Sequence, residues 1–205
     1  PGTATPLIAF GAAAITGGLM TAGPSLFVLS PPLLEGVDLN LTIHDTQIEA
    51  MASTIYLHWT ATHDGWIRPG HYHSIVTGDG QVHRLHAYDV DLPAHTWRRN
   101  TDSVALAVAC MGGIPDPWTQ APSPLQLSSL CQEAASLARR LGWGAEEITL
   151  QRVMTHAEAA ANRDERTLHD NYGPVSWGGT GERWDLLQLH RDGPLDGGDR
   201  LREQI

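Results

Sequence analysis

The sequence of 205 residues contains no lysine, so that all 13 of its basic residues are arginine. Against these stand 23 acidic residues, which gives a formal net charge of −10. A nucleic-acid-binding protein needs a basic face that displaces counterions from the phosphate backbone. The charge balance therefore argues against nucleic acid as a partner and leaves neutral or mixed-charge ligands open.

Cysteine is also scarce, because Cys110 and Cys131 are the only two. They do not form a metal-type pair, and we expect two buried free thiols, with a disulfide as the less favoured alternative. Histidine is abundant by contrast, at 11 residues. Clustered histidines suit zinc, so the histidines are the first place to look for chemistry.

Charged side chains are absent from residues 1–34. The stretch from Leu7 to Leu29 is long enough to cross a bilayer, but glycines and a proline interrupt it and no basic residue precedes it, as one would in a secretory signal. Three interpretations stay open: packing against the rest of the chain or a partner, contact with a membrane or a protein assembly, and the remnant of a targeting segment. The chain begins with Pro1, which indicates a processed product or a piece of a longer protein.

The pattern after residue 45 predicts one α/β domain with a central mixed sheet flanked by helices. We divide the chain into an apolar N-terminal extension (1–45), this domain (46–192) and a polar, solvated tail (193–205). Strands are expected at 54–59, 73–77, 81–85, 103–110 and 151–155, the second and third forming a hairpin around Gly78-Asp79-Gly80. Ser123 and Pro124 predict the start of a helix that ends near Leu141, and shorter helices are expected at 157–163 and 184–190.

Two histidines stand at strand ends. His58 closes the first apolar strand and His156 follows the last one, so a sheet can present both from one end. Asp185 adds a carboxylate from the segment Arg183-Trp184-Asp185. A zinc hydrolase needs three protein ligands and one open position for water. His58, His156 and Asp185 are therefore the predicted metal ligands.

The segments that carry these residues resemble, in the same order, the motifs of the zinc-dependent N-acetylmuramoyl-L-alanine amidases. Phage lysozymes of the amidase type and peptidoglycan recognition proteins share this family. The resemblance covers residues 53–190. Its motifs here are Leu57-His58-Trp59-Thr60, Tyr72-His73 before an apolar strand, Ala94-His95 with Asn100 and Ser103-Val104, Thr155-His156-Ala157-Glu158, and Arg183-Trp184-Asp185.

The resemblance implies an enzyme that hydrolyses the amide between the lactyl group of N-acetylmuramic acid and the first L-alanine of the stem peptide. Zinc is then the cofactor, peptidoglycan the partner, and the periplasm or cell wall the place of action, as for an endolysin or a cell-wall-penetrating assembly. Catalytic roles follow for three residues, with Arg183 stabilising the oxyanion and Tyr72, helped by Glu158 or a water, orienting the nucleophile or relaying its proton. His73, His95 and Trp59 are predicted to bind substrate.

The chain departs from the family pattern in three places. His156 and Asp185 are 185 − 156 = 29 residues apart, more than is usual, and the insertion offers Asp164, His169 and Asp170 as alternative third ligands. Arg183 stands where the family has lysine, and arginine cannot shuttle a proton. Ala107 matches a strand position at which some relatives carry glutamate, which favours the version of the site that uses Tyr72.

Two other functions compete with the amidase. Some members of the family bind peptidoglycan without cutting it, typically after losing a zinc ligand, whereas this chain keeps a full ligand set. A zinc peptidase of another type is disfavoured because the chain contains no His-Glu-x-x-His motif.

Overall fold

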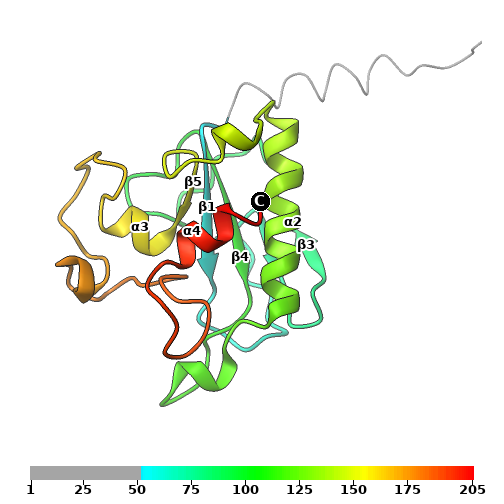
Figure 1. Cartoon of the computed structure of the whole chain (residues 1–205). Coiled ribbons are helices and arrows are strands. Elements are labelled where there is room, and N and C mark those ends of the chain that lie inside the picture. Colours follow the sequence, from blue (N-terminus) through cyan, green and yellow to red (C-terminus); the bar gives the residue numbers. More distant parts are fainter. Residues whose placement is uncertain (1–51) are drawn as a thin grey trace, which may run out of the picture. The chain divides into compact units, whose positions relative to one another are not determined.

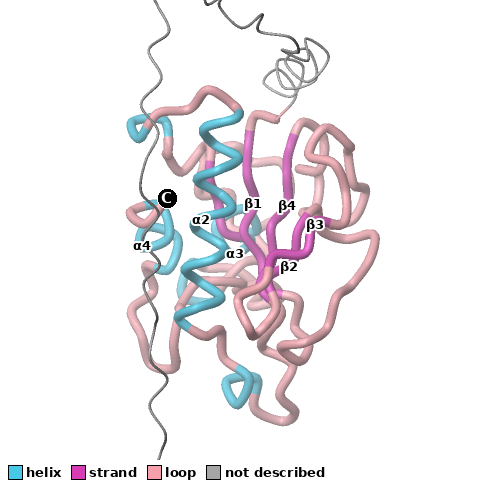
Figure 2. The backbone as a smooth tube through the Cα atoms, turned by 90° about the vertical axis from the view of Figure 1, so that its right-hand side faces the viewer, coloured by secondary structure: helices cyan, strands magenta, loops and turns pink. Residues whose placement is uncertain are grey.

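The computed structural model describes residues 52–205. The apolar segment 1–34 and the domain boundary predicted at residue 45 lie outside these residues. Within the described part, five strands form one sheet in the order β3-β2-β4-β1-β5 (Figures 1 and 2). β2 and β3 are antiparallel and all other neighbours are parallel, so the prediction of an α/β domain with a mixed sheet is confirmed. The strands are β1 (Thr54–Trp59), β2 (Ser74–Val76), β3 (Val82–Arg84), β4 (Ser103–Val108) and β5 (Val153–Thr155).

β1 and β4 form the centre of the sheet, and every residue of both is buried. Side chains alternate between the two faces of a strand. In β4 the large residues Val104, Leu106 and Val108 join the main core. The alternate positions in and just after β4 are Ser103 and three alanines, of which Ala107 and Ala109 pack with Ile75 on the opposite face. The second face is therefore lined by small side chains, which leaves room for polar groups there.

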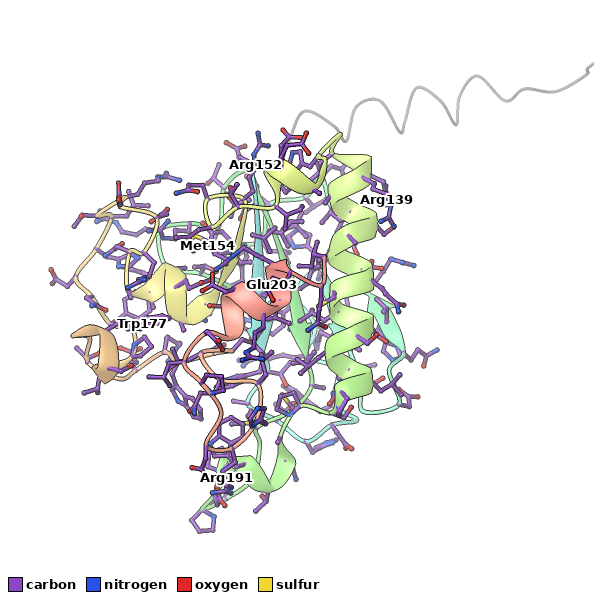
Figure 3. The ribbon with its side chains drawn as sticks, in the orientation of Figure 1. Arg139, Arg152, Met154, Trp177, Arg191 and Glu203 are labelled. Carbon is purple, nitrogen blue, oxygen red and sulfur yellow. The ribbon has the colours of Figure 1, made fainter. Side chains whose placement is uncertain are left out.

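Helix α2 (Pro124–Arg140) covers the first face, with Leu130 and Leu137 buried against the sheet. Ser123 caps it as predicted, since its side chain accepts from the Gln126 backbone while the Gln126 side chain accepts from the Ser123 backbone. The Gln126 amide also donates to the carbonyl of Ala109 (2.7 Å). The helix start is thus fixed to the end of β4, and Arg139 on its outer side faces away from the sheet (Figure 3).

The second face carries the short helix α3 (His156–Ala160) and the long segment that follows it (Figure 1). Tyr56, Met154 and Ala159 form a small core between α3 and the sheet. Single 3-10 turns occur at η1 (Pro117–Gln120), η2 (Ala145–Glu147) and η3 (Val175–Trp177). Cys110 and Cys131 are buried free thiols, which confirms the sequence prediction. Among the described residues, no helix has the length and apolarity that crossing a membrane requires.

The predictions for the C-terminal part were wrong in two places. Residues 184–190 form turns, although their leucines recur at helical spacing, and Leu186 adopts a φ of 60° that a helix does not allow. The expected solvated tail contains helix α4 (Gly197–Arg202), which packs on β5 and α2. Its Leu201 is 0% exposed. α4 therefore covers the outer strand of the sheet between α2 and α3 (Figure 1).

Leu201→Ala is expected to lower the free energy of unfolding by about 2–5 kcal/mol, because it opens a cavity between α4, α2 and the sheet. Urea denaturation at constant pH measures this change. Leu195→Ala is the matched control, since Leu195 is 45% exposed, and it should stay within about 0.5 kcal/mol of the wild type. Equal effects of the two substitutions would show that α4 is not part of the core.

Candidate metal centre

Three polar side chains converge at the end of β1. His58 comes from β1, His156 is the first residue of α3, and Asp185 lies in the turn that follows the long insertion. The two Nδ1 atoms are 3.1 Å apart, and Asp185 Oδ2 lies 3.4 Å from His156 Nδ1 and 3.9 Å from His58 Nδ1. All three residues are buried. The structure therefore brings together the three residues that the sequence predicted as ligands.

The spacing of these donor atoms fits a zinc ion. Four ligands at about 2.0–2.1 Å around a tetrahedral ion place neighbouring donor atoms about 3.3 Å apart. The three separations of 3.1, 3.4 and 3.9 Å scatter around that value. Two imidazoles and one carboxylate are also a donor set that catalytic zinc sites use, with a further position left for water.

The protonation state suits metal binding as well. Burial lowers the pKa of His58 to about 4, so the ring is neutral at pH 7. Burial by itself would raise the pKa of Asp185, but the neighbouring His156 and His58 outweigh it and hold that pKa well below its ordinary value. Ligands must be deprotonated to bind a metal, and both of these are in the required form.

A series of hydrogen-bonding groups extends from the Nε2 side of the His58 ring. Its Nε2 lies 3.3 Å from Thr96 Oγ1, which lies 2.9 Å from His95 Nδ1. His95 Nε2 in turn lies 3.3 Å from Ser103 Oγ, whose hydroxyl donates to the carbonyl of Asn100 (2.8 Å). If each group donates toward that carbonyl, His58 Nε2 carries the proton and Nδ1 keeps its lone pair for a metal.

Burial lowers the pKa of His95 far below its usual value, with His58 as the next cause, so His95 remains neutral and able to take part in this series. His95 also lines the cleft described below. Thr96 was not singled out by the sequence, since a threonine after Ala94-His95 gives no signal of its own. The contact with His58 identifies it as a residue that orients a ligand.

Tyr72 and Arg183 lie next to the three predicted ligands. The Tyr72 ring is 5.2 Å from the ring of His58, and its hydroxyl donates to the carbonyl of Trp59 (3.4 Å). Burial, followed by the charge of Asp185, raises the pKa of Tyr72 above its usual value, so the hydroxyl keeps its proton at neutral pH and acts as a hydrogen-bond donor. The Arg183 side chain is 45% exposed and forms an ion pair with the more exposed Glu182 (3.4 Å), and both residues line the cleft described below.

A cleft of about 960 Å³ opens beside His156 and Arg183. One wall comes from residues 93–98, including His95 and Trp97, and the other from the insertion, including His169 and Tyr172. The insertion that separates His156 from Asp185 therefore builds one side of the cleft.

The alternative third ligands are placed elsewhere. Asp164 is buried and accepts two hydrogen bonds from Arg99, at 2.6 and 3.0 Å. His169 and Asp170 line the cleft wall and are not part of the group of converging donors. Ala107 lies opposite His58 in the β1–β4 register, so no carboxylate occupies that strand position.

The geometry does not favour substrate binding by His73 or Trp59. His73 is 0% exposed, and both ring nitrogens contact the backbone, Nε2 at Val90 O (2.7 Å) and Nδ1 at Ala105 N (3.0 Å). Trp59 is buried against Trp118 and Trp184 on the α2 side of the sheet. Adjacent residues of a strand point to opposite faces, so Trp59 points away from the site that contains His58.

Glu158, which was predicted to be catalytic, makes contacts that hold two helices in place. Its carboxylate accepts from the backbone of Thr155 (2.8 Å), which completes a capping box at the start of α3. It also accepts two hydrogen bonds from Arg202 of α4, at 2.9 and 2.7 Å, and neither side chain of this ion pair is more than 10% exposed. Glu158 therefore connects α4 to the helix that begins with His156.

α4 contacts the segment of the third predicted ligand as well. Gly197 donates to the carbonyl of Leu187 (3.0 Å), and a Cβ on Gly197 would lie 2.1 Å from the carbonyl oxygen of Leu186. The carbonyl of Asp185 itself accepts from the backbone of Ala157 in α3 (3.3 Å). α4 thus contacts both segments that carry His156 and Asp185, and we expect it to brace them.

No protein-family model matches the sequence, and the search of curated proteins finds no match either. Among solved structures, the amidase LysC from Clostridium intestinale is 15% identical with a TM-score of 0.41, over 55% of this chain and 74% of that one. The endolysin of a Thermus scotoductus bacteriophage is 18% identical with a TM-score of 0.40, over 62% and 80%. The Drosophila peptidoglycan recognition protein PGRP-LB is 15% identical with a TM-score of 0.39, over 53% and 71%. The structural neighbours are thus amidases, endolysins and peptidoglycan recognition proteins.

Asp185→Asn is expected to weaken zinc binding by more than about 100-fold, because it removes the anionic donor, whereas changes behind a ligand cost 10–100-fold. Competition with a chromophoric chelator measures the affinity. Asp164→Asn should keep one zinc per chain while losing up to about 3–5 kcal/mol of stability, since it weakens the buried pair with Arg99. Loss of zinc in the Asp164 variant alone would move the third ligand into the insertion.

Gly197→Ala is expected to weaken zinc binding about tenfold or more and to change the visible spectrum of the cobalt-substituted protein, because the new Cβ displaces the Leu186 carbonyl next to Asp185. Gly142→Ala is the control: it strains a residue with a φ of 73° but meets no atom within 4 Å. An unaltered cobalt spectrum in Gly197→Ala would contradict the bracing role of α4.

Proposed function

We propose that this protein is a zinc-dependent N-acetylmuramoyl-L-alanine amidase that acts on peptidoglycan. One observation carries the proposal: His58, His156 and Asp185 come together, buried and with zinc-like spacing, at the edge of a cleft. The sequence motifs around these residues resemble the amidase family, and the cleft gives access for a large substrate. The proposal places the protein at the bacterial cell wall, as an endolysin or part of a cell-wall-penetrating assembly.

The donor set fits a hydrolase better than a structural zinc site. A structural site closes the tetrahedron with four protein ligands, usually with cysteine among them. Here three described residues converge, and neither buried cysteine belongs to the group. A zinc ion held by these side chains would supply a water of lowered pKa and polarise the scissile carbonyl.

Arg183 stabilises the negative charge that develops on the carbonyl oxygen of the lactyl amide. It stands at the mouth of the cleft, and its charge contributes to the lowered pKa of His58, after burial and nearer groups. Because arginine stays protonated, it offers hydrogen bonds and charge but no proton transfer. This explains how arginine serves at a position where the family uses lysine.

Tyr72 holds a proton and not a negative charge at the pH of the cell wall, since its pKa lies above the usual value. Its hydroxyl can turn from the carbonyl of Trp59 toward a water or a substrate oxygen next to His58. Tyr72 therefore orients the nucleophile as a donor. The proton that the nucleophile loses needs another acceptor, because the Tyr72 oxygen already carries a proton.

The test is incubation of the zinc-loaded protein with purified peptidoglycan and mass spectrometry of the products. We expect free stem peptides that begin with L-alanine. Arg183→Gln should lower kcat/KM by about 10²–10³-fold, as losing one oxyanion donor does, with the zinc content unchanged as the control. If the wild type sediments with peptidoglycan but releases no peptide, the protein is a binding module and the amidase proposal is wrong.

A further inference from the structure

The insertion between His156 and Asp185 is held as a rigid wall by two successive arginines. Arg98 donates to the carbonyl of Leu168 (2.7 Å), which joins the two walls of the cleft. Arg99 is buried and binds Asp164 in two places, together with the side chain of Asn162 (3.1 Å). The walls are thus positioned before any ligand arrives.

Two polar atoms in this wall are buried without a hydrogen-bond partner among the described residues: His169 Nε2 and Tyr172 OH. Such atoms are rare in folded proteins, because each one costs free energy unless something satisfies it. The two rings lie 4.7 Å apart, and both residues line the cleft. His169 Nδ1 contacts the carbonyl of Asp170 (3.0 Å) and must donate to it, so Nε2 is left as an acceptor beside the Tyr172 hydroxyl.

Tyr172 shares the cleft with Trp97, which comes from the segment 93–98. Trp97 lines the cleft with 65% of its surface exposed, the most exposed tryptophan among the described residues. An indole ring that is open to solvent at the mouth of a cleft offers an apolar face to a ligand.

Two arginines line this part of the cleft. Arg98 is engaged with Leu168, and Arg183 pairs with Glu182 (3.4 Å) at the end nearer the metal centre. Asp170 adds an exposed negative charge. Around His169 and Tyr172 the cleft offers a ligand an apolar ring face, one acceptor and one donor.

We propose that Trp97, His169 and Tyr172 form a sugar-binding subsite that holds an N-acetylhexosamine of the glycan strand. The inference rests on the proposed amidase function and adds to it which part of the substrate the insertion recognises. The apolar face of the sugar ring stacks on Trp97, and its hydroxyl or N-acetyl groups satisfy His169 and Tyr172. The cleft, at about 960 Å³, lies at the upper end of the range for small-molecule pockets and holds more than the reacting amide.

The stem peptide fits this end of the cleft less well. Stem peptides carry free carboxylates, which require an uncommitted cation or backbone N–H donors. The wall formed by residues 167–170 presents an acceptor and a carboxylate in their place. The peptide is therefore expected to leave the metal centre in another direction, and a neutral sugar occupies the insertion side.

The probe for the test is the β-1,4-linked tetramer of N-acetylglucosamine, which has the sugar and N-acetyl groups of the glycan but neither the peptide nor the scissile amide. Titration into the full chain, followed by tryptophan fluorescence and calorimetry, is expected to show saturable binding. Trp97→Ala should weaken it about tenfold or more, and Tyr172→Phe about fivefold, the loss of one hydrogen bond. Trp97 is exposed and Tyr172→Phe removes one atom, so both variants should fold.

Trp177→Ala is the matched control, because Trp177 lies on the outer side of the same insertion and does not line the cleft (Figure 3). It should bind the tetramer as the wild type does. The inference is overturned if the wild type does not bind the tetramer at millimolar concentration, if Trp97→Ala binds equally well, or if a free stem peptide displaces the tetramer. Binding is measured without cleavage, so a protein that binds the tetramer through Trp97 but cuts nothing would refute the amidase and keep the sugar subsite.

Discussion

The surrounding structure has to hold two imidazoles and a carboxylate, those of His58, His156 and Asp185, close together in a buried position. Three donor atoms within 4 Å of one another need both a dry environment and fixed orientations. The chain meets the first need with the small alanines of β4 on this face of the sheet, which make room for His58. It meets the second with Thr96 behind His58, the capping box before His156, and the backbone contact between Ala157 and Asp185.

The sequence allowed the sheet and the ligand set to be predicted because both depend on strong local signals. Residues 54–59 and 103–108 are mostly apolar and rich in strand-forming residues, and His58 stands near the end of the first strand while His156 follows β5. Trp59 was predicted to bind substrate. The alternation of side chains that places His58 in the site sends its neighbour Trp59 to the other face, where it packs on Trp184. Applying the alternation to both residues would have corrected the prediction.

The C-terminal errors have a different origin. α4 contains a single large apolar residue, Leu201, so its sequence has no helical periodicity. What holds it is specific to the fold: the close approach of Gly197 to Leu186 and the buried ion pair of Arg202 with Glu158. Glu158 looked catalytic because it stands two residues after a ligand, yet its charge is matched by an arginine 44 residues away. Contacts at such separations leave no pattern in a single sequence.

The position of α4 has a consequence for the order in which the centre is assembled. All three predicted ligands precede α4 along the chain, yet the segments that carry His156 and Asp185 are both braced by it. During synthesis, the ligands leave the ribosome before the element that braces their segments. A metal ion that bound before α4 had emerged and packed would therefore be held by ligands whose segments are not yet braced.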